Sequence, residues 1–188
     1  ILKRNDPTSA AKQVSLTELG SIKINKEERT KMYKTIPRSS VIGFLIGVLP
    51  GAGATIASFL AYGMERNVVS DEEKEKFGKG SVNGLSAPET ANNAACSGSF
   101  VPMLTLGIPG SGTTAVMLGA LLGFGVQPGP RLYMTNPEIF WSIIMSMYIG
   151  MVILLILNLP LIPYIARILA VPKNYLIPLI LFFSVTGI

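Results

Sequence analysis

The chain has 188 residues, of which 49% are hydrophobic and 14% are charged. A soluble domain usually carries about 25% charged residues, and uncharged runs as long as Ser39–Gly63 are rare outside membranes. This composition indicates a membrane protein and argues against a soluble domain with a large core. Because the chain has one cysteine and no histidine, it cannot form an internal disulfide, a histidine metal site or a Ser-His triad, and we expect no enzymatic activity.

Residues 1–38 are polar and basic. They contain nine Lys or Arg and four Asp or Glu, and this net charge of +5 equals that of the whole chain. Positive side chains beside a spanning segment stay in the cytoplasm, so we expect residues 1–38 to form a basic cytoplasmic segment and residues 39–188 to be transmembrane. A nucleic-acid-binding arm is the alternative, but interleaved acidic residues disfavour it, and no nucleic acid is expected as a partner.

The uncharged run Ser39–Gly63 is interrupted in its middle by LPGAGAT at Leu49–Thr55. Proline lacks the amide hydrogen and glycine weakens a helix, so the pattern predicts two half-helices around a break at Pro50–Gly53. We interpret the run as one crossing, which would place the charged loop Met64–Gly80 on the side of the membrane opposite to residues 1–38.

The small-residue region Ser81–Gly98 contains Glu89, Asn92 and Asn93 and is too polar for a helix that faces lipid. A re-entrant hairpin and a helix buried among others both fit the sequence. A helix beginning near Pro88 would place Glu89 in its first turn. The oxygens of the three side chains suit Na⁺ or a transported proton, and asparagine can also donate to a carboxylate. The alternative role is a hydrogen-bonded contact between helices or an exposed cap.

A second uncharged run, Phe100–Gly125, is broken by IPGSGTT at Ile108–Thr114. Prolines and a glycine indicate that Gln127–Glu138 is a loop. Ile139–Tyr164 has the length and composition of a spanning helix, and Asn174–Ile188 begins another. The sequence therefore predicts an all-α membrane protein, a polytopic helical bundle with Pro/Gly-broken or re-entrant helices. Because the chain starts at Ile1 and stops inside an apolar run, we expect it to be a fragment of a longer protein.

The two interruptions form an internal repeat, since Pro50–Thr55 and Pro109–Thr114 align as P-G-[AS]-G-[AT]-T. Repeated broken helices are typical of transporter binding sites, and the Ser or Thr can cap the second half-helix. Free amides and the positive dipole end at such a terminus favour an anion. Tight helix packing is the alternative reading. The predicted substrate-binding residues are Gly51, Ala52, Gly53, Thr55, Gly110, Ser111, Gly112, Thr113, Thr114, Asn92 and Asn93.

Most of the chain after Ser39 resembles TctA, the large membrane subunit of the tripartite tricarboxylate transporters. The combination of APETANNAA (Ala87–Ala95) with LTLGIPG (Leu104–Gly110) is more specific than a single glycine motif. Thr90 and Cys96 depart from the small residues expected at their positions. The four matching stretches are GFLIGVLPGAGATIASFLAYGMER (Gly43–Arg66), FGKGSVNGLSAPETANNAA (Phe77–Ala95), VPMLTLGIPGSGTTAVMLGALLGFGVQPGP (Val101–Pro130) and LNLPLIPYIARILAVPK (Leu157–Lys173).

The resemblance implies part of the C-terminal half of a multi-pass secondary transporter in the bacterial inner membrane, built as an inverted repeat. It implies a small membrane subunit and a periplasmic solute-binding protein as partners. The substrate would be a tricarboxylate such as citrate or a related organic carboxylate, and the coupling ion Na⁺ or H⁺. Glu89, Asn92 and Asn93 are the residues expected to couple the ion. No cofactor is expected, and no metal site beyond one for Na⁺. A non-transporting membrane scaffold or sensor subunit is the rival interpretation.

Overall fold

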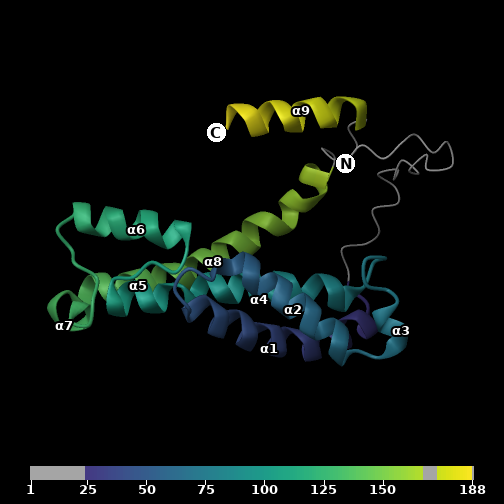
Figure 1. Ribbon diagram of the computed structural model, residues 1–188, viewed down its shortest axis with the longest axis horizontal. Helices are drawn as coiled ribbons and strands as arrows, with labels where there is room; N and C mark the ends of the chain where they lie inside the picture. The colour runs from purple at the N-terminus through teal and green to yellow at the C-terminus, as the bar shows by residue number, and fades with distance from the viewer. Residues whose placement is uncertain (1–23, 167–172, 188) are drawn as a thin grey trace. The chain divides into compact units, whose positions relative to one another are not determined.

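The computed structural model of the chain describes residues 24–166 and 173–187 (Figure 1). Every regular element in these ranges is a helix, which confirms the expected all-α class for the residues described. Most of the basic segment, residues 1–23, lies outside them. The described residues divide into two parts, Ile24–Met145 and a second part that begins at Ser146, and each is considered separately.

The first part begins with helix α1, Lys26–Val48, which runs through the expected boundary at residue 38 without interruption. Asn25 and Glu28 fix its start through a capping box, in which each side chain accepts a hydrogen bond from the other residue's backbone N–H, at 2.8 and 2.9 Å. The charged first half of α1 and its uncharged second half therefore form one continuous helix.

The chain reverses direction between α1 and α2, Gly53–Val68. Gly51 and Gly53 have φ of 80° and 69°, a left-handed conformation that glycine adopts without strain. The predicted break at Pro50–Gly53 is therefore confirmed, with α1 ending at Val48 and α2 beginning at Gly53.

The break is a turn rather than a kink within one crossing. The end of α2 returns to the first half of α1, where Arg38 Nη2 lies 2.7 Å from Glu65 Oε1. The loop after α2 contains α3, Asp71–Lys74, and reaches the same end of α1, where Lys31 Nζ lies 2.8 Å from Glu73 Oε1. The expectation that Met64–Gly80 lies on the opposite side of the membrane from the start of α1 is therefore wrong.

Helix α4, Val82–Gly98, is one continuous helix that packs against both α1 and α2 (Figure 1). The Ser81 side chain caps it by accepting a hydrogen bond from Gly84 N at 3.0 Å. The region forms a helix packed among others rather than a hairpin, with one side buried against α1 and α2 and the opposite side exposed. Pro88 lies inside α4, so the helix does not begin there and Glu89 is not in its first turn.

Small side chains at every fourth position form the contact between these helices, which we call the small-residue seam. A Cβ atom on Gly43 would overlap the carbonyl oxygen of Ala91, and one on Gly47 would overlap that of Ala95. These pairs show that α1 and α4 run parallel. Helix α2 runs antiparallel to α4, because Ser58 contacts Pro88 whereas the later Glu65 contacts the earlier Asn83. The seam consists of Thr35, Ser39, Gly43 and Gly47 of α1, Ala57 and Ala61 of α2, and Asn83, Ala87, Ala91 and Ala95 of α4.

Helix α5, Phe100–Leu106, continues the direction of α4 through Ser99, which has helical dihedral angles. Beyond it, α6 (Gly112–Gly123), α7 (Leu132–Thr135) and the start of α8 (Pro137–Ala166) pack on α5 around an apolar cluster. The buried members of this cluster are Met103, Leu104, Val126, Leu132 and Ile143.

The second part contains the remainder of α8 and the helix α9, Lys173–Thr186. Among the described residues, Pro137–Ile162 is the one helical stretch long and apolar enough to cross a membrane, judged by length and composition. It agrees with the spanning helix predicted at Ile139–Tyr164. Its apolar side chains are largely exposed, as expected of a helix that faces lipid or another protein surface.

Candidate functional site

The second Pro-Gly interruption separates α5 from α6. Gly107 ends α5 with φ of 70°, and the chain then passes through Pro109 and Gly110 to the start of α6. Ser111 caps α6 in a reciprocal pair with Thr114: Thr114 N donates to Ser111 Oγ at 3.2 Å, and Ser111 N donates to Thr114 Oγ1 at 2.8 Å. The predicted cap is therefore confirmed at this break.

No side chain caps α2 at Ala52, so the predicted cap is absent at the first break. The two repeats thus differ in how many backbone N–H groups at the helix start are available to bind a ligand. At α6 the Thr114 amide is already satisfied by Ser111, whereas the first-turn amides of α2 have no side-chain partner. An anion would gain more from the uncapped helix start.

The two breaks lie at the same level of the fold. Gly110 is buried against Ser99 and the last turn of α1: a Cβ atom on Gly110 would lie 2.9 Å from Ser99 Cβ and 3.3 Å from Gly47 O. From this level α2 runs back along α4, whereas α6 runs in the opposite direction beside α5 (Figure 1). Two helix N-termini therefore begin where the interruptions meet, and their dipoles are opposed in direction.

The predicted substrate-binding residues of the two turns differ in exposure. Gly51, Thr55, Gly112 and Thr113 are exposed, Ala52, Gly53 and Ser111 are half-buried, and Gly110 and Thr114 are buried. Thr114 is fully buried and its hydroxyl is engaged with Ser111, so it holds the turn together and is not free to contact a ligand. The exposed residues leave room for a ligand or for another part of the protein.

The three polar residues of α4 do not share one surface. Glu89 and Asn93 are exposed on the side of α4 away from the small-residue seam, and Asn93 Nδ2 donates to the Glu89 carbonyl at 2.9 Å. Asn92 is half-buried, and its Nδ2 lies 3.4 Å from Ser58 Oγ of α2. Ser58 also reaches the Pro88 carbonyl at 3.2 Å. Asn92 therefore makes a contact between helices, the alternative role considered for it.

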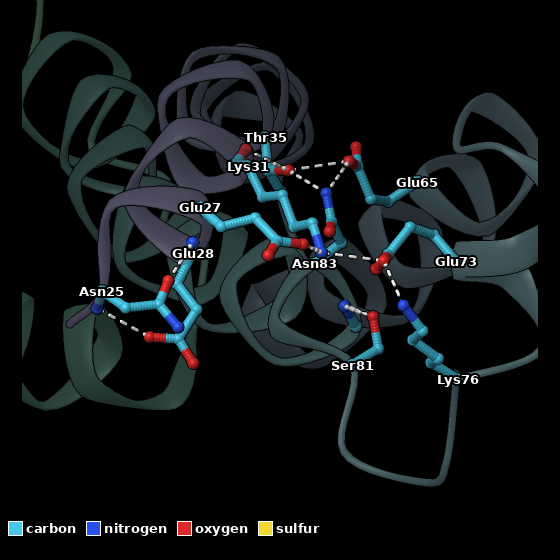
Figure 2. Close-up of polar contacts among 11 residues, drawn as sticks. Asn25, Glu27, Glu28, Lys31, Thr35, Glu65, Glu73, Lys76, Ser81 and Asn83 are labelled. Atoms are coloured by element: carbon cyan, nitrogen blue, oxygen red, sulfur yellow. Dashed lines mark hydrogen bonds and ion pairs between the residues drawn. The ribbon is translucent and has the colours of Figure 1, made fainter.

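A buried charged network, which the sequence did not reveal, lies at the end of the seam where α1 and α4 begin (Figure 2). Glu65 is only 2% exposed. Its Oε1 accepts hydrogen bonds from Thr35 Oγ1 at 2.7 Å, Arg38 Nη2 at 2.7 Å and Asn83 Nδ2 at 3.2 Å. Asn83 Nδ2 also donates to Thr35 Oγ1 at 2.8 Å. We call these four residues the Glu65 network.

A more exposed ionic cluster adjoins the Glu65 network at the start of α1 (Figure 2). Lys31 Nζ lies 2.8 Å from carboxylate oxygens of both Glu27 and Glu73, and Lys76 Nζ lies 2.7 Å from Glu73. Hydrogen bonds to Glu27 and Glu73 raise the pKa of Lys31, and hydrogen bonds from Lys31 and Lys76 lower the pKa of Glu73. Lys31 and Glu73 therefore stay charged near neutral pH. The cluster ties the loop after α2 to α1.

Comparisons with known proteins place the chain in a family. The family described as "Tripartite tricarboxylate transporter TctA family" matches residues 2–188. Two relatives come from Agrobacterium vitis. One, an "Uncharacterized 52.8 kDa protein in TAR-I ttuC' 3'region", is 39% identical over 184 residues, 98% of this chain and 36% of the relative. The other, an "Uncharacterized protein in TAR-II ttuC' 3'region", is 45% identical over 145 residues, 77% of this chain and 59% of the relative.

No solved structure is a significant match to the chain. The regular elements of residues 24–166 and 173–187 are all helices, one of them long and apolar enough to cross a bilayer, and a transporter family matches residues 2–188. The class of the protein is therefore a component of a membrane transporter. More particularly, the chain belongs to the TctA family of the tripartite tricarboxylate transporters, which confirms the resemblance noted in its sequence. It spans about a third to three fifths of the length of these relatives.

Proposed function

We propose that this chain is part of the membrane subunit of a secondary transporter that takes up tricarboxylates or related organic carboxylates into bacteria. The subunit would span the inner membrane several times and receive its substrate from a periplasmic solute-binding protein. A small membrane subunit would be its second partner, and a gradient of Na⁺ or H⁺ would drive uptake. The observation that carries the proposal is the meeting of the two Pro-Gly breaks, with Gly110 against Gly47.

The depth of the breaks supports a site inside the bilayer. The uncharged part of α1, Ser39–Val48, is about 15 Å long at 1.5 Å per residue, which is half of a hydrocarbon core about 30 Å thick. The uncharged part of α2, Gly53–Met64, is of similar length. A hairpin anchored at the membrane boundary by its charged ends would therefore bring the breaks to about mid-depth, where transporters bind their solutes.

The chemistry at the breaks suits an anion. The uncapped start of α2 offers backbone N–H groups and the positive end of a helix dipole, each partly buried interaction contributing on the order of 1 kcal/mol. Glu89 lies about 15 Å along the axis of α4 from Ser99, the residue at the end of α4 that packs against Gly110. This distance is too large for one small carboxylate to contact both Glu89 and the breaks. We therefore assign Glu89, with Asn93 beside it, to ion coupling rather than to direct substrate contact.

Uptake into sealed vesicles that contain all three components tests this proposal. Labelled mono-, di- and tricarboxylates would be compared with and without Na⁺ and with and without a pH gradient. We expect accumulation of one class of carboxylate against its gradient, dependent on the binding protein and lost when the driving ion gradient is collapsed. Vesicles without the binding protein are the control. A scaffold or sensor subunit would accumulate no substrate under any of these conditions, and that result would contradict the proposal.

A further inference from the structure

The small-residue seam does not by itself define how far α1 and α4 are shifted along each other. In the observed register Gly43 faces Ala91 and Gly47 faces Ala95. Because small residues recur at every fourth position, a slip of four residues would place Gly43 against Ala95 and Gly47 against Ser99. Every facing pair would remain small, and the shift along the axis would be about 6 Å. Close packing of this kind therefore leaves two registers of similar quality.

The Glu65 network distinguishes these registers, because it occurs at one point of the seam only. Asn83 is the member contributed by α4, and it reaches both Thr35 of α1 and Glu65 of α2. A four-residue slip would bring Ala87 opposite Thr35, and alanine can donate no hydrogen bond from its side chain. The buried Glu65 carboxylate would then lose its hydrogen bond from α4. Leaving buried polar groups of the network without partners is energetically unfavourable, so the slipped register is destabilised.

We infer that Asn83, acting with Thr35, Arg38 and Glu65, fixes the register of α4 on the α1–α2 hairpin and is a positioning residue for the breaks. Buried polar groups are known to set the register of otherwise repetitive helix contacts. In the slipped register the last turn of α1 would move about 6 Å along α4, into the space beside Ser99 where Gly110 now packs. The observed contact between the two breaks would therefore be lost. The functional consequence rests on the proposed transport role, whereas the register itself does not.

Binding of a coupling cation at this network is less consistent with its geometry. Arg38 already neutralises Glu65 at 2.7 Å, and Thr35 and Asn83 direct hydrogen-bond donors at the same carboxylate oxygen. Asn83 turns its amide nitrogen toward Glu65, whereas a cation would require its oxygen. A second positive charge beside Arg38 would be repelled. The network is therefore suited to holding the helices in place.

Cysteine cross-linking in membranes, with the intact protein in a Cys96→Ser background, measures the register directly. The pair Ser39→Cys/Ala87→Cys reports the observed register, and Ser39→Cys/Ala91→Cys reports the slipped one. Disulfides form only between Cα atoms about 4.4–6.8 Å apart, so a shift of one turn separates the two pairs. With the Glu65 network intact, we expect the first pair to cross-link at least about tenfold faster than the second.

Asn83→Leu keeps the approximate volume of the side chain and removes only the α4 member of the network. We expect the cross-linking preference to fall about tenfold, which corresponds to the loss of a hydrogen bond to a charged group, and uptake to fall with it. Asn67→Leu, at an exposed position of α2, is the matched control and should keep both the preference and the uptake. A preference that stays tenfold in Asn83→Leu would overturn the inference.

Thr35→Val is a second, nearly isosteric test that removes the hydroxyl joining Asn83 to Glu65. It should also reduce the preference, and an unchanged preference in this variant would count against the inference equally. Cross-linking needs no substrate, so its outcome is independent of uptake. Failure of the unmodified transporter to accumulate carboxylates would contradict the proposed function and leave the cross-linking result standing.

Discussion

Gly110 lies at the closest approach between the second break and α1. The space for a side chain there is occupied by Ser99 and by the carbonyl of Gly47. A larger residue must push apart the two elements that bring the breaks together, and overpacking of this kind typically costs about 1–3 kcal/mol. The position is therefore sensitive at the residue scale even though it carries no functional group.

We predict that Gly110→Val lowers carboxylate uptake by about tenfold or more while the amount of protein in the membrane stays close to normal. Uptake in vesicles and quantitative immunoblotting of the membrane fraction would be measured together. Gly119→Val is the control, because nothing lies within 4 Å of a Cβ atom at Gly119 on α6. Wild-type uptake by Gly110→Val protein would show that the contact between the breaks is dispensable.

The roles of residues whose partners are nearby in the sequence could be predicted, whereas the roles of residues whose partners are distant could not. The cap of Ser111 on α6 follows from residues three positions apart, so the sequence indicated it correctly. The sequence places Glu65 in a loop, because its partners Thr35, Arg38 and Asn83 are distant in the chain and no local pattern reports them. One signal was present: Asn83 and Thr35 each begin a row of small residues spaced by four, a pattern typical of close helix contacts.

At the scale of elements, the main departure from expectation is the hairpin formed by α1 and α2. Proline and glycine at Pro50–Gly53 predicted the end of one helix and the start of the next, but not the angle between them. A kinked crossing and a reversal share that local pattern. The ion pairs of Arg38 with Glu65 and of Lys31 with Glu73 show the reversal, and no local sequence rule reports contacts of that range.

The hairpin predicts that both charged ends of α1–α2 are accessible from one side of the membrane. Single cysteines at Lys34 and Lys79, both exposed, would be introduced in a Cys96→Ser background. A membrane-impermeant maleimide should label both in inside-out vesicles and neither in right-side-out vesicles, if the positive segment is cytoplasmic as its charge predicts.

Labelling after permeabilisation, which should reach both cysteines in either kind of vesicle, is the control. Labelling of Lys34→Cys and Lys79→Cys from opposite sides would exclude a re-entrant hairpin and restore the single crossing first inferred from the sequence.

At the scale of the whole molecule, composition predicted the class of the protein correctly. The low charge and long apolar runs indicated helices in a membrane, and the stretch Pro137–Ile162 of α8 has the expected length and hydropathy. The packing of α4 against two neighbours was not predictable, since polar and small residues in Ser81–Gly98 fit both a buried helix and a re-entrant hairpin. The packed helix is possible because Gly43 and Gly47 of α1 have no side chain, and a Cβ atom at either position would collide with α4.

We predict that a charge in the middle of α8 impairs its insertion into the membrane. Ile149 is 56% exposed, and arginine at the centre of a spanning helix costs about 2.5–3.5 kcal/mol on insertion scales. Ile149→Arg should therefore lower the inserted fraction of α8 in a glycosylation reporter, whereas Ser142→Arg, near the end of the helix, should have a smaller effect. Equal insertion of Ile149→Arg and the unmodified helix would argue against α8 as a lipid-facing span.

The reversal at Pro50–Gly53 also has a consequence for biogenesis. Neither arm of the hairpin has enough uncharged length to cross a bilayer, and the turn would expose unsatisfied backbone groups to lipid if it entered alone. We therefore expect the two arms, α1 and α2, to remain at the membrane surface during synthesis and to insert only after α4 has emerged from the ribosome. In nascent chains that stop at Gly80, a cysteine at the exposed Leu60 of α2 should be labelled by a membrane-impermeant maleimide, and in chains that extend past Ser99 it should be protected.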